Sequence, residues 1–275
     1  MHKPRIICLY LDGTLLDGRK RISARKQRAL QSAADAGIEI VPATGRFYLG
    51  IPEQVRNLPF IHYAITINGA AVWDLQAGRA LLREELPWQK AAAIMTQLDA
   101  LPVIYDCYLD DWGWMSQAHY DRAADFAPHR HSLEMLRKFR TPVPELKAHL
   151  ARLGHGVQKL QAFFLDPALR ARTMAELAGD PELAVSSSIP RNMELNSRDA
   201  QKGEALLRLA ALLGIAREET VAFGDDLNDV SMLKAAGLGV AMGNASAEAR
   251  AAADIQTASC DENGVARTLA TLLDV

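Results

Sequence analysis

The chain has 275 residues, of which 49% are hydrophobic, and this supplies enough apolar surface for one large or two modest folded domains. Lysine and arginine number 31 and aspartate and glutamate 33, which gives a formal net charge of −2. This near balance argues against a general nucleic-acid binder or a protein that adheres to anionic membranes, because both usually carry a basic surplus.

Strand-like and helix-like segments alternate from the first residues onward, which predicts a parallel sheet flanked by helices. Residues 5–11 form an almost continuous apolar run, as expected of a central strand covered on both faces. This run is too short for a signal peptide or a membrane span. Ser23 is a candidate N-cap of a helix that ends at Gly37. Further strands are predicted at residues 38–41 and 64–67.

A different pattern begins near residue 82, in a stretch that holds three of the four tryptophans. Strands are predicted there at residues 103–109, 157–164 and 182–185, with helices between them. An α+β insertion of this length is large enough to fold as a small domain. We therefore predict an α/β core domain and an inserted α+β cap domain, with the core at residues 1–83 and 191–275 and the cap at residues 84–190.

The first pattern returns after this insertion. Residues 202–213 predict a buried helix, because they are apolar on nearly all sides. Strands are expected at residues 220–223 and 238–242. The predicted fold class is α/β, a Rossmann-like parallel sheet interrupted by a cap.

The three cysteines, Cys8, Cys107 and Cys260, are far apart and form no Cys-x-x-Cys pair. We therefore expect a reduced, cytoplasmic protein without a disulfide framework or a zinc site. The run His129-Arg130-His131 has no nearby cysteine or acid, so we expect a surface segment rather than a metal site.

Polar residues gather at the predicted carboxyl ends of strands, which is where ligand sites lie in open α/β sheets. They are Tyr10, Asp12 and Thr14 after the first strand, Thr44 and Arg46 after the second, and Asp225, Asn228 and Asp229 after a later one. Lys202 begins a helix, where backbone N–H groups favour an anion. Several carboxylates and an ammonium suit a phosphate with Mg²⁺, because this ion takes oxygen ligands and offsets the charge of the phosphate.

These segments resemble the motifs of the haloacid dehalogenase-like (HAD) phosphatases. Residues 9–16, Leu-Tyr-Leu-Asp-Gly-Thr-Leu-Leu, resemble the first motif, Asp-x-Asp-Gly-Thr-Leu-Leu. Thr44 in Ala-Thr-Gly-Arg resembles the second, Lys202 in Gln-Lys-Gly the third, and residues 224–229 the fourth, Gly-Asp-x-x-Asn-Asp. Each motif alone is weak, since Asp12-Gly13 by itself is typical of a turn. Four in the right order are specific.

Further matches are to the Cof-type subgroup, which carries a mixed α/β cap between the second and third motifs. They are Asn-Gly-Ala at residues 68–70, Met-Glu-Leu at 193–195, Met-Gly-Asn-Ala at 242–245 and Asp-Glu-Asn-Gly-Val-Ala at 261–266. The resemblance covers essentially the whole chain. It implies a HAD-like fold and a Mg²⁺-dependent hydrolase of small phosphorylated metabolites.

The resemblance also implies a role for each matching residue. Thr44, Gly45 and Arg46 bind the substrate, and the Thr44 hydroxyl donates to the transferring phosphoryl group. Lys202 neutralises the phosphate, and Asn228 lies beside it. Mg²⁺ is held by Asp225, by Asp229 directly or through water, and by the backbone carbonyl of Asp12. The carboxylate of Asp12 protonates the leaving group and then activates water.

The first motif departs from the family at Tyr10, which stands where the nucleophilic Asp is expected. A phenol, whose ordinary pKa is about 10, is a poor nucleophile at neutral pH. A phosphotyrosine ester is far more stable than an acyl phosphate, so turnover would stall. The change also removes an anionic Mg²⁺ ligand, and the ring is large enough to occupy the place of the phosphate. We therefore expect severely impaired hydrolysis.

Three functions remain open from the sequence. The first is a phosphomonoesterase of small metabolites, in which one base change has turned an Asp codon into a Tyr codon. The second is a pseudo-phosphatase that binds a phosphorylated metabolite or partner protein without turnover. The third is a phosphomutase, which needs the same missing carboxylate.

The cap supplies specificity in enzymes of this kind, and its residues follow no recognisable motif. Lys159, Arg191 and Glu194 are candidates for the substrate cleft. The cap aromatic residues either stack on a substrate or form the small core of the cap. They are Tyr105, Tyr108, Trp112, Trp114 and Tyr120.

Overall fold

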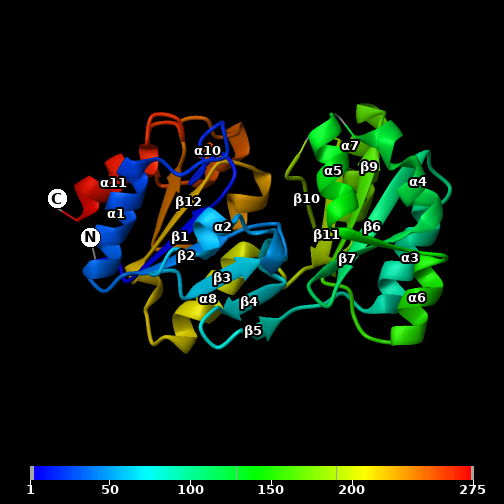
Figure 1. Ribbon diagram of the computed structural model, residues 1–275, viewed down its shortest axis with the longest axis horizontal. Helices are drawn as coiled ribbons and strands as arrows, with labels where there is room; N and C mark the ends of the chain where they lie inside the picture. Colours follow the sequence, from blue (N-terminus) through cyan, green and yellow to red (C-terminus); the bar gives the residue numbers. More distant parts are fainter. Residues whose placement is uncertain (1–2, 128, 190, 274–275) are drawn as a thin grey trace. The chain divides into compact units, whose positions relative to one another are not determined.

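The computed structural model describes residues 3–127, 129–189 and 191–273. The chain divides into two compact units, a core unit of residues 1–83 and 201–275 and a cap unit of residues 84–200 (Figure 1). Within the described ranges, no helix is long and apolar enough to cross a membrane.

The core unit contains one eight-stranded sheet in the order β14-β13-β12-β1-β2-β3-β4-β5. The strands from β14 to β3 pair in parallel, and β4 and β5 add an antiparallel edge. Their bounds are β1 Ile6–Tyr10, β2 Glu39–Ala43, β3 Tyr63–Thr66, β4 Ala71–Asp74, β5 Arg79–Arg83, β12 Thr220–Gly224, β13 Leu238–Ala241 and β14 Ile255–Gln256. The predicted α/β fold class with a parallel sheet is confirmed.

Helices cover both faces of this sheet. They are α1 Ala24–Asp35, α2 Glu53–Arg56, α8 Lys202–Leu212, α9 Val230–Ala235, α10 Ala247–Ala252 and α11 Gly264–Leu272. Short 3₁₀ turns accompany them, at η1 Tyr48–Gly50, η2 Ile67–Gly69, η3 Arg217–Glu219 and η4 Leu227–Asp229. Ser23 caps α1 as predicted, since its side chain accepts a hydrogen bond from the backbone N–H of Lys26.

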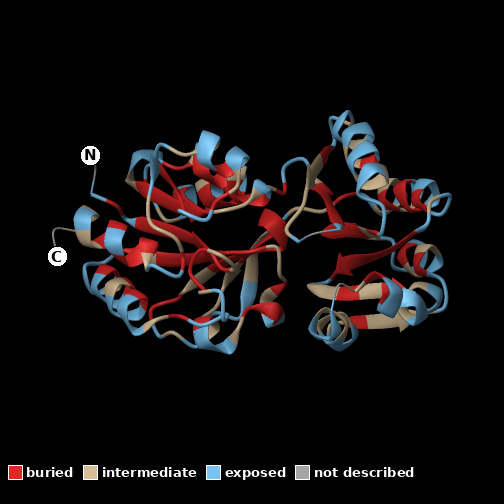
Figure 2. Cartoon of the chain, turned by 90° about the horizontal axis from the view of Figure 1, so that it is seen from above, coloured by how far each residue is buried: buried red, intermediate tan, exposed pale blue. Residues whose placement is uncertain are grey.

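All five residues of β1 are buried, and successive side chains point to opposite faces of the sheet. Ile7 and Leu9 belong to the hydrophobic cluster that includes residues of α1 and α11. Ile6, Cys8 and Tyr10 belong to the cluster formed with α8 and α9. Figure 2 shows the central strands buried and the outward sides of the helices exposed. The end of β1 therefore lies in the middle of the core, between two packed layers.

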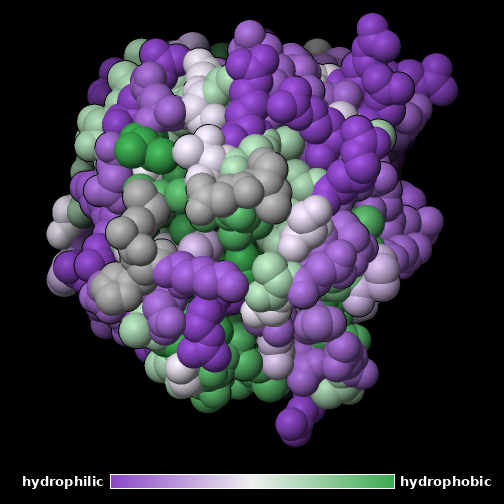
Figure 3. Space-filling view, turned by 90° about the vertical axis from the view of Figure 1, so that its left-hand side faces the viewer, coloured by the Kyte–Doolittle hydropathy of each residue, from purple (hydrophilic) through white to green (hydrophobic). Residues whose placement is uncertain are grey.

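The outer surface of the core is largely polar where α1 and α11 lie. Figure 3 shows this side, on which hydrophilic side chains predominate and hydrophobic ones form separate patches between them. The buried side of α1 carries Leu30 and Ala33, while Lys26 is buried as well. This buried lysine donates hydrogen bonds to the backbone carbonyls of Thr14 and Leu15.

The cap unit is built on a six-stranded sheet in the order β10-β11-β9-β6-β7-β8. Its strands are β6 Val103–Leu109, β7 Trp112–Ser116, β8 Arg140–Val143, β9 Lys159–Phe164, β10 Leu183–Ser186 and β11 Asn192–Ser197. Its helices are α3 Trp88–Leu98, α4 Gln117–Phe126, α5 Arg130–Lys138, α6 Leu146–Leu153 and α7 Pro167–Ala178. Neighbouring strands are antiparallel except for the parallel pair β7 and β8.

One boundary differs from the prediction. Strand β11 was assigned to the core, which was expected to resume at residue 191. In the structure β11 pairs with β9 and β10 of the cap sheet, and the core unit resumes at Gln201. The predicted boundary itself follows Pro190, which lies outside the described residues.

Replacing the N-cap residue of α1 tests how firmly this helix is anchored. Ser23→Ala removes the hydrogen bond to the N–H of Lys26 and the bond between the Ser23 hydroxyl and Asn263, so the free energy of unfolding in urea should fall by at least about 1 kcal/mol. Ser32→Ala is the matched control, because Ser32 is exposed in the same helix and should change stability by less than about 0.5 kcal/mol. Equal losses in the two variants would contradict the assigned cap.

Candidate active site

The structure brings together side chains from β1, α8 and the segment after β12. Tyr10 is the last residue of β1, Lys202 is the first residue of α8, and Asp229 ends η4. The Nζ atom of Lys202 lies 2.6 Å from Oδ1 of Asp229 and 3.9 Å from the centroid of the Tyr10 ring. The predicted third and fourth motifs therefore meet at the end of the first strand.

Lys202 and Asp229 form an ion pair that is wholly buried, since both side chains have 0% exposure. The second oxygen of Asp229, Oδ2, accepts hydrogen bonds from the backbone N–H groups of Asp225 (2.9 Å) and Asp226 (3.2 Å). Lys202 also faces the ring of Tyr10, an arrangement in which the ring attracts the cation. Both buried charges therefore have partners, as buried charges require.

Asp225 lies directly against the first-motif loop, which we define as residues 11–16. Its Oδ1 accepts a 2.6 Å hydrogen bond from the Thr14 hydroxyl. Gly13 has φ +83°, and a Cβ atom there would lie 2.3 Å from Oδ2 of Asp225, so only glycine fits. Burial and the nearby charge of Asp229 raise the pKa of Asp225 to about 7.

The carboxylate of Asp12 is held by two cations. Arg46 Nε and Nη2 donate to its Oδ2 at 3.1 and 2.9 Å, and Lys20 Nζ lies 2.8 Å from its Oδ1. Burial alone would raise the pKa of Asp12, but the charges and hydrogen bonds of Arg46 and Lys20 outweigh burial and lower it. Arg46 was predicted as a substrate-binding residue, and here it contacts Asp12. Lys20 was not predicted, because it lies in a turn outside every motif.

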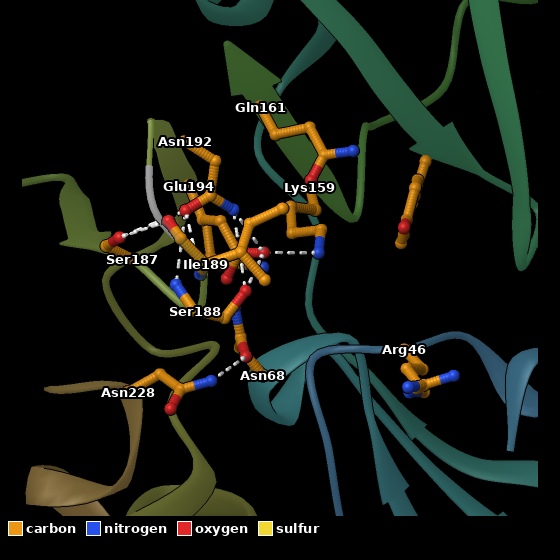
Figure 4. A network of polar contacts seen from close by, with 12 residues as sticks. Arg46, Asn68, Lys159, Gln161, Ser187, Ser188, Ile189, Asn192, Glu194 and Asn228 are labelled. Carbon is orange, nitrogen blue, oxygen red and sulfur yellow. Dashed lines mark hydrogen bonds and ion pairs between the residues drawn. The ribbon is translucent and has the colours of Figure 1, made fainter. Parts of the chain in front are cut away.

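Thr44 and Asn228 lie on two sides of Asn68, a residue of η2. The backbone N–H of Asn68 donates to the carbonyl of Thr44 (3.0 Å), and the Thr44 hydroxyl accepts from the N–H of Arg46 (3.2 Å). Nδ2 of Asn228 donates to Oδ1 of Asn68 at 3.3 Å (Figure 4). Oδ1 of Asn228 is buried and has no hydrogen-bond partner among the residues that the structure describes. Gly45 packs closely on Asn68, since a Cβ atom there would lie 2.8 Å from Oδ1 of Asn68 and would require that side chain to shift.

The oxygen atoms of this site are ligands of the kind that a hard cation prefers. Asp225, Asp229 and the carbonyl of Asp12 offer only oxygen, and Mg²⁺ is bound in proteins through one or two carboxylates plus water. Among residues 3–127, 129–189 and 191–273, no three His, Cys, Asp or Glu side chains form a group that could hold a metal.

The cap unit carries two buried ion pairs on one face of its sheet. Lys159 Nζ lies 3.0 Å from Oε1 of Glu194, which also accepts from the Ser188 hydroxyl at 2.9 Å (Figure 4). Arg140 Nε lies 2.9 Å from Oδ2 of Asp106. The two predicted cleft residues Lys159 and Glu194 are thus paired with each other.

The other cap candidates are exposed, packed in the cap core or part of a helix cap. Arg191 is exposed, and Tyr105 and Trp114 pack into the hydrophobic core of the cap. His129 caps α5, since its Nδ1 accepts from the N–H of Ser132, and it is exposed as predicted.

Comparisons with known proteins agree with this geometry. The phosphatase YwpJ of Bacillus subtilis is 33% identical over 98% of this chain and 100% of its own length. The pyridoxal phosphate phosphatase YbhA of Escherichia coli is 31% identical over 91% of this chain and 92% of its own. A solved haloacid dehalogenase-like hydrolase from B. subtilis superimposes with a TM-score of 0.83 at 31% identity, covering 96% of this chain and 98% of that one. The family model of haloacid dehalogenase-like hydrolases matches residues 7–269, and the chain belongs to this family.

Proposed function

We propose that the chain is a Mg²⁺-dependent phosphomonoesterase of small phosphorylated metabolites whose turnover is severely impaired by Tyr10. The observation that supports this most directly is the assembly of Lys202, Asp225 and Asp229 around the end of β1, where only the nucleophile is replaced. The substrate class is supported by two relatives that are named for small phosphorylated molecules. YbhA is a pyridoxal phosphate phosphatase, and YcsE of B. subtilis is a 5-amino-6-(5-phospho-D-ribitylamino)uracil phosphatase.

In this proposal Asp225, Asp229 and the Asp12 carbonyl would hold Mg²⁺. When bound, the ion would neutralise the charge of the phosphoryl group. The raised pKa of Asp225 favours this assignment, since a carboxylate that resists ionisation beside another carboxylate is stabilised by a cation.

Tyr10 changes the environment of Lys202 as well as the nucleophile. In the family pattern this lysine neutralises the phosphate and the attacking carboxylate. Here its ammonium lies 2.6 Å from Asp229 and 3.9 Å from the centroid of the Tyr10 ring. A phosphate must therefore compete with Asp229 for the charge of Lys202, so both the nucleophile and part of the anion-binding charge are lost.

The contacts of Arg46 and Lys20 with the Asp12 carboxylate affect how readily it gains or loses a proton. Arg46 and Lys20 keep its pKa below the ordinary value, so the carboxylate is ionised at neutral pH. In this arrangement both Oδ1 and Oδ2 are already bonded to a cation, which disfavours the acceptance of a proton by either. Donation to a leaving group requires that at least one of the two cations first moves away.

A second candidate function is binding without turnover, as in a pseudo-phosphatase. The ion pair of Lys202 with Asp229 and the replacement of the nucleophile favour this function. The same scaffold would then recognise a phosphorylated metabolite or partner and release it unchanged.

Restoring the carboxylate tests the phosphatase proposal. Tyr10→Asp should produce Mg²⁺-dependent release of phosphate from p-nitrophenyl phosphate, at a rate at least about a thousandfold above that of the native chain. Tyr10→Asn is the matched control, because it removes the ring and has the size of Asp but supplies no nucleophile. It should remain as inactive as the native chain. A Tyr10→Asp variant that binds Mg²⁺ and stays inert would refute the phosphatase proposal.

The pH dependence of stability tests the environment of Asp225 in metal-free buffer. Its folded-state pKa of about 7 lies above that of an unfolded Asp, so the folded chain binds the extra proton. The contribution of Asp225 to the free energy of unfolding should therefore fall as pH rises from about 4 to about 7. Asp225→Asn removes this loss. The free energy of unfolding of the variant, measured in urea relative to that of the native chain, should therefore be higher at pH 8 than at pH 5.

Asp35→Asn serves as the control for this measurement, because Asp35 is exposed on α1. Its pH profile should parallel that of the native chain. Parallel profiles for Asp225→Asn and the native chain would contradict the raised pKa.

A further inference from the structure

Three consecutive carbonyl groups of the first-motif loop accept hydrogen bonds from side chains that lie outside the loop. Nδ2 of Asn244 donates to the carbonyl of Gly13 at 2.8 Å. Nζ of Lys26 donates to the carbonyls of Thr14 at 3.3 Å and Leu15 at 2.8 Å. These contacts begin at the residue directly after Asp12, so they fix the backbone on which Asp12 is carried.

The two donors come from opposite environments. Lys26 belongs to α1 and is fully buried, and burial lowers its pKa. Asn244 lies in the turn after β13 and is exposed. Its own Oδ1 accepts a 2.9 Å hydrogen bond from the N–H of Cys260, which orients the amide toward Gly13.

The segment after Cys260 contacts the residues that follow the first-motif loop. Oδ1 of Asp261 accepts a hydrogen bond from the N–H of Gly18 at 2.8 Å, and Asn263 is hydrogen-bonded to the hydroxyl of Ser23. Residues 242–245 and 261–266 have no role in the proposed chemistry. Both segments nevertheless contact the connection between β1 and α1, which carries Asp12.

Asn244 also approaches Asp225, the carboxylate that packs on Gly13. Its Nδ2 lies 3.5 Å from Oδ2 of Asp225 while it donates to Gly13. Gly13 has no room for a side chain against this carboxylate. The amide of Asn244 therefore spans the two groups, and its loss would free the Gly13 carbonyl to turn relative to Asp225.

We propose that Asn244 is a positioning residue, which fixes the Gly13 carbonyl and so sets the distance between the Asp12 backbone carbonyl and the Asp225 carboxylate. Lys26 fixes the next two carbonyls from the buried side. The consequence for metal binding rests on the proposed function, whereas the effect on the loop does not. Asn244 is the residue to test, because replacing the buried Lys26 would leave two carbonyls unsatisfied and endanger the fold.

Amide hydrogen exchange of the metal-free native chain gives the first measurement. The N–H groups of Thr14, Leu15 and Leu16 donate to carbonyls of Tyr10 and Leu11, so their exchange reports opening of this loop. Asn244→Ala should raise exchange in residues 12–16 by about tenfold and leave that of β12 unchanged. Asn57→Ala is the control, because Asn57 is an exposed residue at the end of α2. Unchanged exchange in Asn244→Ala would overturn the proposal.

The second measurement uses the Tyr10→Asp background. There Asn244→Ala should raise the Mg²⁺ concentration for half-maximal activity by about tenfold, with an unchanged KM for p-nitrophenyl phosphate, because residues behind metal ligands act mainly on metal affinity. Equal Mg²⁺ dependence with and without Asn244 in an active enzyme would also overturn the proposal. If Tyr10→Asp is inert, the proposed function fails, and hydrogen exchange alone then decides the role of Asn244.

Discussion

Lys202 and Asp229 form the ion pair around which the core site is arranged, and neither side chain touches solvent. Removing two charges from water is costly, and the attraction between them compensates only when the remaining polar atoms are also satisfied. Two backbone N–H groups donate to Asp229, and the ring of Tyr10 faces the ammonium of Lys202. The pair therefore fixes the start of α8, the segment after β12 and the end of β1 relative to one another.

This constraint explains how the fold accommodates Tyr10. The residue is on the face of β1 that packs with α8 and α9, within a cluster that includes Val41, Ala43 and Ile65. An aromatic ring there gains apolar contacts that a carboxylate would lack. Tyr10 brings no negative charge, so the ammonium of Lys202 is paired with Asp229 and faces the ring.

The sequence predicted the elements whose signals are local. The apolar run 5–11 became β1, residues 103–109 became β6 within the same bounds, and Ser23 caps α1. The rule that ligand sites lie at strand ends correctly grouped Tyr10, Asp225 and Asp229, because it depends only on the order of strands.

What the sequence did not predict depends on contacts between distant segments. Strand β11 was assigned to the core, but it pairs with β9 and β10 of the cap sheet, because the pattern of a strand does not specify which sheet it joins. The contact of Lys20 with Asp12 lies within the β1–α1 connection, and that of Asn244 with Gly13 joins two separate loops; both depend on where an exposed side chain points. No pattern of spacing encodes that direction.

The pairing of charges finally indicates where a cation would act. In the core, Asp229 is paired with Lys202, and Asp12 is paired with Arg46 and Lys20. In the cap, Lys159 is paired with Glu194 and Arg140 with Asp106. Asp225 differs from these carboxylates, because within the described part of the chain it accepts from a hydroxyl and lies in no ion pair. Burial and the nearby charge of Asp229 raise its pKa to about 7, so a cation bound beside Asp225 would favour its ionised form.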